Sequence, residues 1–156
     1  MRQLLYVLVI ALGFAPVYGC SMNKDLPDPQ EEDNHPQKAN MKLKISVGGK
    51  TATAILYDNP TSRDFVTLLP LTVKMDDYAG TEKIFYPARK LSSQGAPAGF
   101  NPSAGDLTLY APWGNIALFY KDFGYSAGLI SLGRITSGIE AFAVKGAVTV
   151  KMELEP

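Results

Sequence analysis

The stretch 105–134, GDLTLYAPWGNIALFYKDFGYSAGLISLGR, decides the fold of this chain. Residues 106–111 and 116–120 each place an apolar side chain at every second position, which is the period expected of β-strands. Residues 112–115, PWGN, supply turn-forming side chains between the two runs, so a hairpin is predicted. Glycines separate this hairpin from a third apolar run, 129–135. The stretch therefore gathers aromatic side chains from several short strands and turns.

Two further alternating runs, 41–47 and 51–57, begin the folded part of the chain. Gly48 and Gly49 lie near the junction of these runs and form a two-residue hairpin signal. The sequence DNPT that follows offers a cap and a proline suited to a first helical turn. Apolar residues then recur at helical spacing until a proline stops the pattern. We therefore expect a helix over about residues 60–69.

The rest of the chain predicts more short strands joined by turns. These strands are expected at 71–75, 83–86 and 147–152. An acidic loop is expected at 76–80, and a second short helix from Ser137 or Gly138 through Ala143. Residues 87–103 are irregular and rich in Gly, Pro and Ser. Because this segment is longer than most connections, it is a candidate functional loop.

About eight short strands and two short helices predict a mainly β fold. A closed antiparallel barrel is favoured, because closure removes exposed strand edges and leaves the helices to cap the ends. A β-sandwich is the alternative. The 156 residues fit one core with appendages. Basic and acidic residues balance at 15 each, which disfavours nucleic acid as a partner, since proteins that bind it usually carry a basic face.

The first nineteen residues have the pattern of an export signal. Arg2 provides a positive start, residues 4–12 form a short apolar core, and residues 17–19 approach a cleavage site before Cys20. The position of Cys20 directly after Gly19 resembles the lipobox of bacterial lipoproteins, whose cysteine is acylated. The resemblance implies a protein lipid-anchored to a membrane of the bacterial cell envelope, facing the periplasm or the surface. The alternative is ordinary secretion with a leftover thiol.

Residues 20–40 are predicted to be a disordered tether, because they are rich in proline and acids and nearly lack apolar side chains. The only histidine, His35, falls in this segment and is expected to be a surface residue. No spaced cluster of metal ligands is present, so neither a metal nor a cofactor is predicted. The expected organisation is a signal peptide at 1–19, a lipidated tether at 20–40 and one domain at 41–156.

Three segments of that domain resemble a known family. They are DNPTSRDFVTLLPLTVKMDDYAGTEKI (58–84), SAGDLTLYAPWGNIALFYKD (103–122) and LGRITSGIEAFA (132–143). Their order, with a hairpin before them and a strand after them, is similar to the cyclophilin barrel and more closely to the bacterial cyclophilin-like domain family. The resemblance covers residues 41–156 and implies a closed antiparallel barrel.

True cyclophilins isomerise peptidyl-prolyl bonds with an arginine, a glutamine and a pocket of phenylalanine, tryptophan and histidine. When the family's spacing is kept, Gln94 matches the glutamine, while Tyr86 occupies the arginine position and Arg89 serves only with a gap. Phe119 fits the pocket phenylalanine. Residues 124–132 have Leu and Ile where the histidine would lie, and they lack the tryptophan. The resemblance thus implies an incomplete catalytic set, with Arg89, Gln94 and Phe119 as candidates expected to converge.

Aromatic and polar side chains around these candidates predict a binding groove. The expected binding residues are Tyr86, Arg89, Gln94, Tyr110, Trp113, Phe119, Tyr120 and Tyr125. Trp113 is either a stacking platform for a ligand or an aromatic folded onto the barrel end, and the tyrosines suit either a pocket wall or barrel packing. Asp76, Asp77 and Glu82 are either an acid–base group or a solvated turn.

Three functions remain open from the sequence. The favoured one is an envelope-anchored domain that binds a peptide or small molecule in an aromatic groove, with weak or no catalysis. The second is a peptidyl-prolyl isomerase that acts on envelope proteins. The third is a small-substrate reductase or hydrolase, for which no motif is present. The sequence gives no indication of an oligomeric state.

Overall fold

The computed structural model describes residues 39–155. The predicted signal peptide, the Cys20 lipidation site and most of the predicted tether lie outside these residues, so those expectations stay predictions. Within the described part, β1 begins at Ala39, two residues before the expected domain boundary. No helix in this part of the chain combines the length and apolar character needed to cross a membrane.

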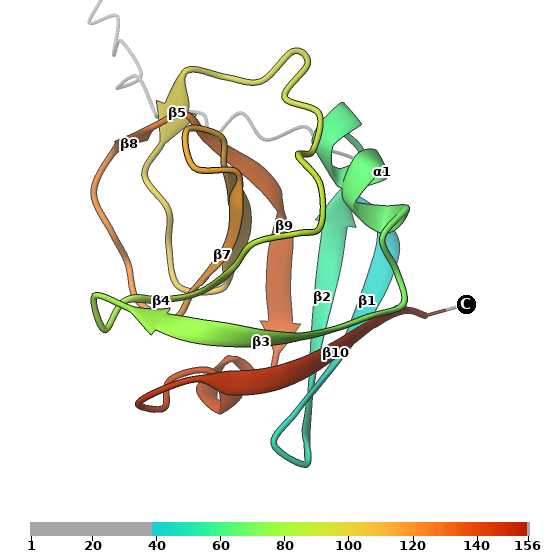
Figure 1. Cartoon of the computed structure of the whole chain (residues 1–156), viewed down its shortest axis with the longest axis vertical. Coiled ribbons are helices and arrows are strands. Elements are labelled where there is room, and N and C mark those ends of the chain that lie inside the picture. Colours follow the sequence, from blue (N-terminus) through green and yellow to red (C-terminus); the bar gives the residue numbers. More distant parts are fainter. Residues whose placement is uncertain (1–38, 156) are drawn as a thin grey trace, which may run out of the picture. The chain divides into compact units, whose positions relative to one another are not determined.

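Eight strands close into an antiparallel barrel, as the sequence predicts (Figure 1). They are β1 (Ala39–Val47), β2 (Lys50–Tyr57), β3 (Leu71–Tyr78), β4 (Glu82–Phe85), β6 (Asp106–Tyr110), β7 (Asn115–Phe119), β9 (Leu129–Ser137) and β10 (Val148–Leu154). Their order around the barrel is β1-β10-β3-β4-β7-β6-β9-β2, and it returns from β2 to β1. The short strands β5 (Gly99–Phe100) and β8 (Ser126–Ala127) pair with each other in a separate two-stranded sheet.

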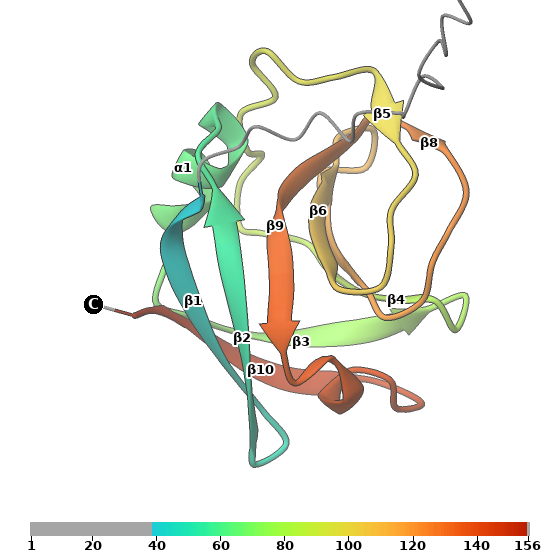
Figure 2. The ribbon, with the colours of Figure 1, turned by 180° about the vertical axis from the view of Figure 1, so that it is seen from behind.

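Only one of the two expected helices forms. Helix α1 (Pro60–Val66) is capped by Asn59, whose side chain accepts a hydrogen bond from the Ser62 backbone N–H. The second prediction is wrong, because a single 3₁₀ turn, η1 (Ile139–Ala141), stands there. The backbone beyond this turn presents carbonyl groups to a buried lysine of β4 instead of continuing a helix. Helix α1 and η1 lie toward opposite ends of the barrel (Figures 1 and 2).

The acidic pair at the end of β3 is also in a strand, where a loop was expected. Asp76, Asp77 and Tyr78 face Ile84, Lys83 and Glu82 in the antiparallel register of β3 and β4. The strand continues because the inward-pointing Asp77 carboxylate meets a cation inside the barrel. The chain reverses only after Tyr78.

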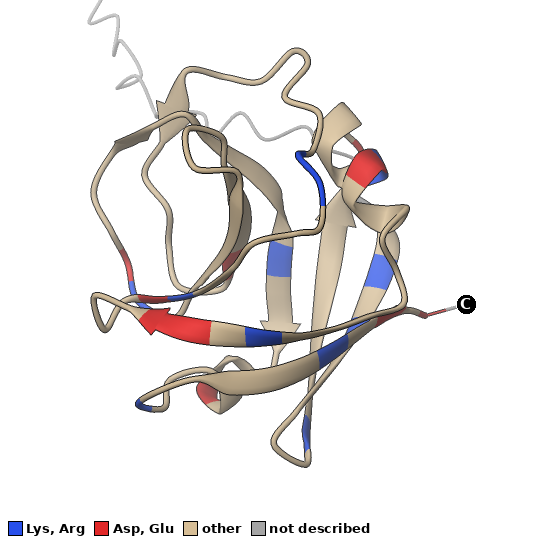
Figure 3. Cartoon of the chain, viewed as in Figure 1, with Lys and Arg blue, Asp and Glu red and all other residues tan. Residues whose placement is uncertain are grey.

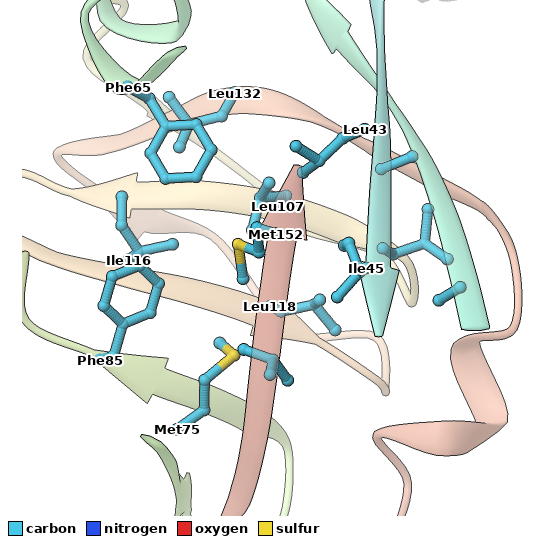
Figure 4. Packing of buried hydrophobic residues seen from close by; sticks show 14 of the residues in the cluster. Leu43, Ile45, Phe65, Met75, Phe85, Leu107, Ile116, Leu118, Leu132 and Met152 are labelled. Atoms are coloured by element: carbon cyan, nitrogen blue, oxygen red, sulfur yellow. The ribbon is translucent and has the colours of Figure 1, made fainter. Parts of the chain in front are cut away.

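Apolar residues at alternate strand positions fill the barrel interior. Leu107 and Leu109 of β6 and Ile116 and Leu118 of β7 are fully or almost fully buried. Phe65 of α1 joins them from one end of the barrel (Figure 4). Fully burying such a side chain contributes about 1.5–3 kcal/mol, so this interior is the main source of stability.

The outward face of the same strands is covered as well. A second cluster, called the outer cluster here, consists of Ala117, Phe119 and Leu129, with Ile84, Phe100 and Tyr110 packed against it. Strands β4, β6 and β7 therefore bury side chains on both faces. The long segment between β4 and β6 contributes Phe100 to this cover, and it carries no charged residue from Leu91 to Gly105 (Figure 3).

Barrel closure between β2 and β9 depends on Gly133. A Cβ atom at this position would lie 2.2 Å from the Ile55 carbonyl oxygen and 2.9 Å from the Leu56 Cα. Only glycine allows the two backbones to approach this closely. The register of β6 against β9 shifts beside this point, between Leu107 and Thr108, as in a β-bulge.

A polar network, called the Lys83 network here, occupies one part of the interior. The Lys83 side chain is fully buried, and its Nζ donates to Asp77 Oδ1 (2.8 Å), Val144 O (2.5 Å) and Gly146 O (2.6 Å). The Tyr120 hydroxyl donates to the same Asp77 oxygen at 2.7 Å. The hydrogen bond from Lys83 and that from Tyr120 lower the pKa of Asp77. Burial, and then the Asp77 carboxylate, raises the pKa of Tyr120 to about 12.

Candidate functional site

A cavity of about 240 Å³ lies outside the barrel wall, over the outward faces of β4, β6 and β7. It is called the aromatic cavity here. Its lining residues are Tyr78, Ala79, Thr81, Glu82, Tyr110, Trp113, Asn115, Phe119, Phe123, Ser126 and Leu129. The volume is below the range of about 300–1,000 Å³ usual for drug-sized ligands. The cavity therefore suits a small ligand or one side chain of a longer one.

Five aromatic rings form most of the wall. Trp113 contacts Tyr78 and Tyr110 edge to face, with ring centroids 5.7 and 5.3 Å apart and planes at 86° and 78°. Phe119 and Phe123 stack at 6.2 Å. Tyr78, Trp113 and Phe123 are 42%, 51% and 53% exposed, so three large rings stand at the solvent boundary of the cavity. Such a concentration of exposed rings is typical of a binding surface.

Glu82 brings a carboxyl group into this apolar wall. It lies opposite Phe119 in the register of β4 against β7, on the face of β4 that points away from the barrel interior. Partial burial raises the pKa of Glu82 to about 7. Within the described residues, its side chain has no ion pair or hydrogen bond that would offset this burial. The carboxyl group is therefore poised between its neutral and charged forms near neutral pH.

Asn115 is the second polar group of the wall. Alternation along β7 places it on the same face as Ala117 and Phe119. Its side chain is 2% exposed, and its Oδ1 atom has no hydrogen-bond partner. An unsatisfied buried acceptor costs about 1–3 kcal/mol, so a native structure that keeps one invites a functional explanation.

Arg89 does not reach this cavity. Its guanidinium donates to both carboxylate oxygens of Asp64 on α1, at 2.5 and 3.0 Å, and to Thr67 Oγ1 at 2.7 Å. The hydrogen bond with Arg89 lowers the pKa of Asp64, and the same bond raises the pKa of Arg89. The backbone N–H of Ser92 also donates to Asp64. This arginine fastens the long loop to α1.

The expected convergence of the catalytic candidates is not found. Gln94 lines a second cavity of about 190 Å³ beside Pro60 and Phe100, whereas Phe119 lines the aromatic cavity and Arg89 lines neither. A proline-isomerising site of the cyclophilin type needs a cation or donor beside the apolar pocket, where it stabilises the twisted amide. Here the group next to Phe119 is a carboxyl.

The predicted binding tyrosines separate into three groups. Tyr110 lines the aromatic cavity together with Trp113. Tyr86 and Tyr125 are each 61% exposed and line neither cavity. Tyr120 belongs to the Lys83 network, on the other side of the barrel wall.

The sequence-based expectation missed most of the wall, including the side chains of Tyr78, Asn115 and Phe123. Asn115 had a usable signal, since it lies two and four positions before Ala117 and Phe119 on one strand. The sequence left Asp76, Asp77 and Glu82 as either an acid–base group or a solvated turn, and the structure does not bring the three together as an acid–base group. Asp77 points into the barrel, Glu82 lines the cavity, and Asp76 is an exposed residue near Lys74. Among the residues that the structure describes, no three His, Cys, Asp or Glu side chains gather as a metal site would require.

Comparison with known proteins identifies a family and a structure of similar fold. The model of a cyclophilin-like family matches residues 45–153. The solution structure of the hypothetical protein AF2241 from Archaeoglobus fulgidus aligns with a TM-score of 0.53 and 18% sequence identity, over 77% of this chain and 98% of that one. At this identity the likeness bears on the fold alone. No curated protein matches the chain.

Proposed function

The chain belongs to the cyclophilin-like family, and from that premise we propose that its barrel is a binding module with weak or no catalysis. The ligand, a peptide or small molecule, occupies the aromatic cavity. One observation carries the proposal: five rings surround two polar groups, Glu82 and Asn115, that the described protein leaves without partners.

The energetics favour a site built for a ligand. Burying a carboxyl and an amide oxygen without partners costs stability, and exposing three large rings to water adds to that cost. A ligand that covers the rings and hydrogen-bonds to Glu82 and Asn115 offsets both the cost of the unpartnered polar groups and the cost of the exposed rings. The Lys83 network is the contrasting case, because its groups are satisfied within the protein and leave nothing for a ligand.

The chain contains a built-in reporter for the test. Trp113 is the only tryptophan and lies in the cavity wall. A fluorescence titration, preceded by a melting screen of small apolar and peptide ligands, should show saturable changes in Trp113 emission. Phe119→Ala should weaken this binding, while Tyr125→Ala, which removes an exposed ring outside the cavity, should leave it unchanged. Equal effects of the two variants would contradict the proposed site.

Prolyl isomerisation is the second candidate, favoured by the apolar pocket around Phe119. A protease-coupled proline-peptide assay tests it with Arg89→Ala and Phe119→Ala. Because Arg89 is held by Asp64 away from the cavity, we expect little activity and no specific loss from the arginine variant. A loss of about 2.7–4 kcal/mol of transition-state stabilisation from Arg89→Ala alone would reverse the order of the two candidates.

We further propose that a lipid on Cys20 anchors the module to the bacterial envelope. The support is the sequence pattern that ends at Gly19 and Cys20. Cell fractionation of Cys20→Ser checks it, and the variant should leave the membrane fraction. Retention of the variant in the detergent phase would contradict the anchor without affecting the proposed cavity.

A further inference from the structure

We propose that the aromatic cavity selects an organic ammonium group, the cationic end of an amine-bearing ligand. This inference rests on the proposed binding function and names the ligand class for the same site. Two kinds of observation lead to it: the hydrogen-bonding character of the wall, and the arrangement of its rings.

Among the described residues, the one buried side-chain atom of the wall that lacks a hydrogen-bond partner is an acceptor, and the carboxyl group beside it adds two more acceptor oxygens when ionised. Asn115 Oδ1 is an amide oxygen without a donor, and the ionised Glu82 carboxylate can only accept hydrogen bonds. Two acceptor groups in one small cavity call for a ligand that brings N–H donors. An ammonium group brings up to three N–H donors. It also brings the positive charge that a carboxylate in an apolar wall needs as a partner.

The rings suit the same group. A cation is attracted to the faces of aromatic rings, and tryptophan and tyrosine attract it more strongly than phenylalanine. The plane of Trp113 is nearly perpendicular to those of Tyr78 and Tyr110, so these three rings present faces in different directions around the cavity. The cavity that these rings line with Glu82 therefore offers a cation aromatic surface in more than one orientation.

Competing charges are absent from the wall. Its lining residues include no Lys, Arg or His, and besides Glu82 the titratable ones are Tyr78 and Tyr110. Lys83 follows Glu82 in sequence, but its Nζ is on the inner side of β4 and is fully used by the Lys83 network. An anionic ligand would face Glu82 without compensation, and a neutral one would leave the carboxylate unpaired.

Cation binding should be linked to loss of a proton. In the free protein, burial raises the pKa of Glu82 to about 7. A bound cation favours the charged carboxylate and lowers this pKa, so binding at neutral pH releases part of a proton. Affinity should accordingly fall as the pH drops below 7, where the free protein holds a neutral carboxylic acid.

Three probes of similar size and different charge test the inference: benzylammonium, benzyl alcohol and benzoate. Each is titrated into the full chain while Trp113 emission is recorded. We expect benzylammonium to bind at least about tenfold more tightly than benzyl alcohol, and benzoate to bind most weakly. Moving from about pH 8 to about pH 6 should weaken benzylammonium about tenfold and leave benzyl alcohol unchanged.

Variants sharpen the test. Glu82→Gln should remove the preference for benzylammonium over benzyl alcohol and its pH dependence, and Asn115→Ala should weaken benzylammonium more than the alcohol. Glu82→Asp keeps the charge and should retain part of the preference, which serves as the second variant should the glutamine one fold poorly. The ammonium group could come from a lysine of a peptide or from a free amine. Comparing a lysine dipeptide blocked at both ends with n-butylammonium distinguishes these two sources.

Three results would contradict the inference, and they differ in what they leave standing. Equal affinity for the three probes leaves a binding site that does not select charge. A preference for benzylammonium that is unchanged in a folded Glu82→Gln rejects Glu82 as the partner of the ammonium group. Binding of apolar ligands in the melting screen without any binding of benzylammonium also rejects the cation while it keeps the module. Failure of the screen itself rejects the proposed function.

Discussion

Glu82 and Lys83 are neighbours on one strand, yet β4 sends them into opposite surroundings. Lys83 points into the barrel, where three acceptors take its ammonium hydrogens within 2.8 Å. Glu82 points outward into an apolar wall where it has no partner among the described residues. A buried charge whose hydrogen bonds are satisfied within the protein stabilises the fold. A charge without partners remains available to a group from outside the protein. The difference separates a structural site from a candidate binding site without reference to any relative.

The largest loss of stability is expected from a substitution that breaks the Lys83 network. Lys83→Met removes the cation and leaves Asp77 and two backbone carbonyls without their donor. Removal of one partner from a buried ion pair typically costs about 3–5 kcal/mol. Urea unfolding should show this loss. Lys74→Met on β3, whose side chain is 70% exposed, should change stability by less than about 0.5 kcal/mol. Similar values for the two variants would show that the network does not hold the barrel.

A smaller loss is expected from the hydroxyl that completes the network. Tyr120→Phe keeps the ring and removes one hydrogen bond to the Asp77 carboxylate. Hydrogen bonds to charged groups contribute about 1.5–3 kcal/mol, so the same unfolding experiment should register a loss in that range. Tyr125→Phe is the control, since its exposed ring has no role in the network. A loss shared by the control would assign the effect to something other than Asp77.

The contribution of Glu82 to stability should change with pH in the opposite direction to that of Asp77. The folded-state pKa of Glu82, about 7, lies above its ordinary value of 4.5, so the folded protein favours the protonated form and loses stability as the pH rises between these values. Asp77 behaves inversely, because its lowered pKa provides stability that is lost as the pH falls below its ordinary value of 3.8.

Glu82→Gln isolates the pH dependence of stability that is due to the Glu82 carboxyl group. At about pH 8 the variant should be more stable than the parent by about 1–2 kcal/mol, a value reduced by the water that still reaches this carboxyl. At about pH 5 the two proteins should differ little, because the parent then carries a neutral acid. Thermal melts at both pH values check this. A variant less stable than the parent at high pH would mean that Glu82 has a stabilising partner.

The smallest change in stability should come from Asn115, the other cavity residue with an unpartnered polar group. Asn115→Ala removes an acceptor that forms no hydrogen bond, so the lost packing and the relieved desolvation partly cancel. We expect a change of less than about 1 kcal/mol. The buried Thr108, whose hydroxyl donates to Ala117 O, supplies the comparison, and Thr108→Ala should cost more. If Asn115→Ala costs as much, its amide has a structural role.

The sequence predicted those parts of this molecule that depend on local spacing. Alternation along β6 and β7 placed Leu107, Leu109, Ile116 and Leu118 on one face, and that face fills the barrel. The same periodicity, with a glycine pair between two runs, predicted the first hairpin. These features follow from neighbours a few residues apart, and the closed eight-stranded barrel followed from their number.

The site depends on contacts that no local pattern specifies. Tyr78 and Phe123 reach the aromatic cavity only because β3, β4 and β7 lie side by side in the closed barrel. Arg89 is turned from the cavity by Asp64, 25 residues earlier in the chain. The acids at the end of β3 were predicted to lie in a solvated loop, because the sequence does not show that Lys83 is the buried partner of Asp77.

The alternation along β7 also constrains how such a protein can change over generations. Positions 115, 117 and 119 face the cavity side, while 116 and 118 face the interior, so codons for the cavity wall and for the core are interleaved. Point substitutions at the first set can alter the cavity wall without touching the second. Insertion or deletion of one codon within the strand would exchange the two sets and lose both at once. Changes in the chemistry of the cavity wall should therefore arise by substitution in the strands, and changes of length should accumulate in the loop between β4 and β6.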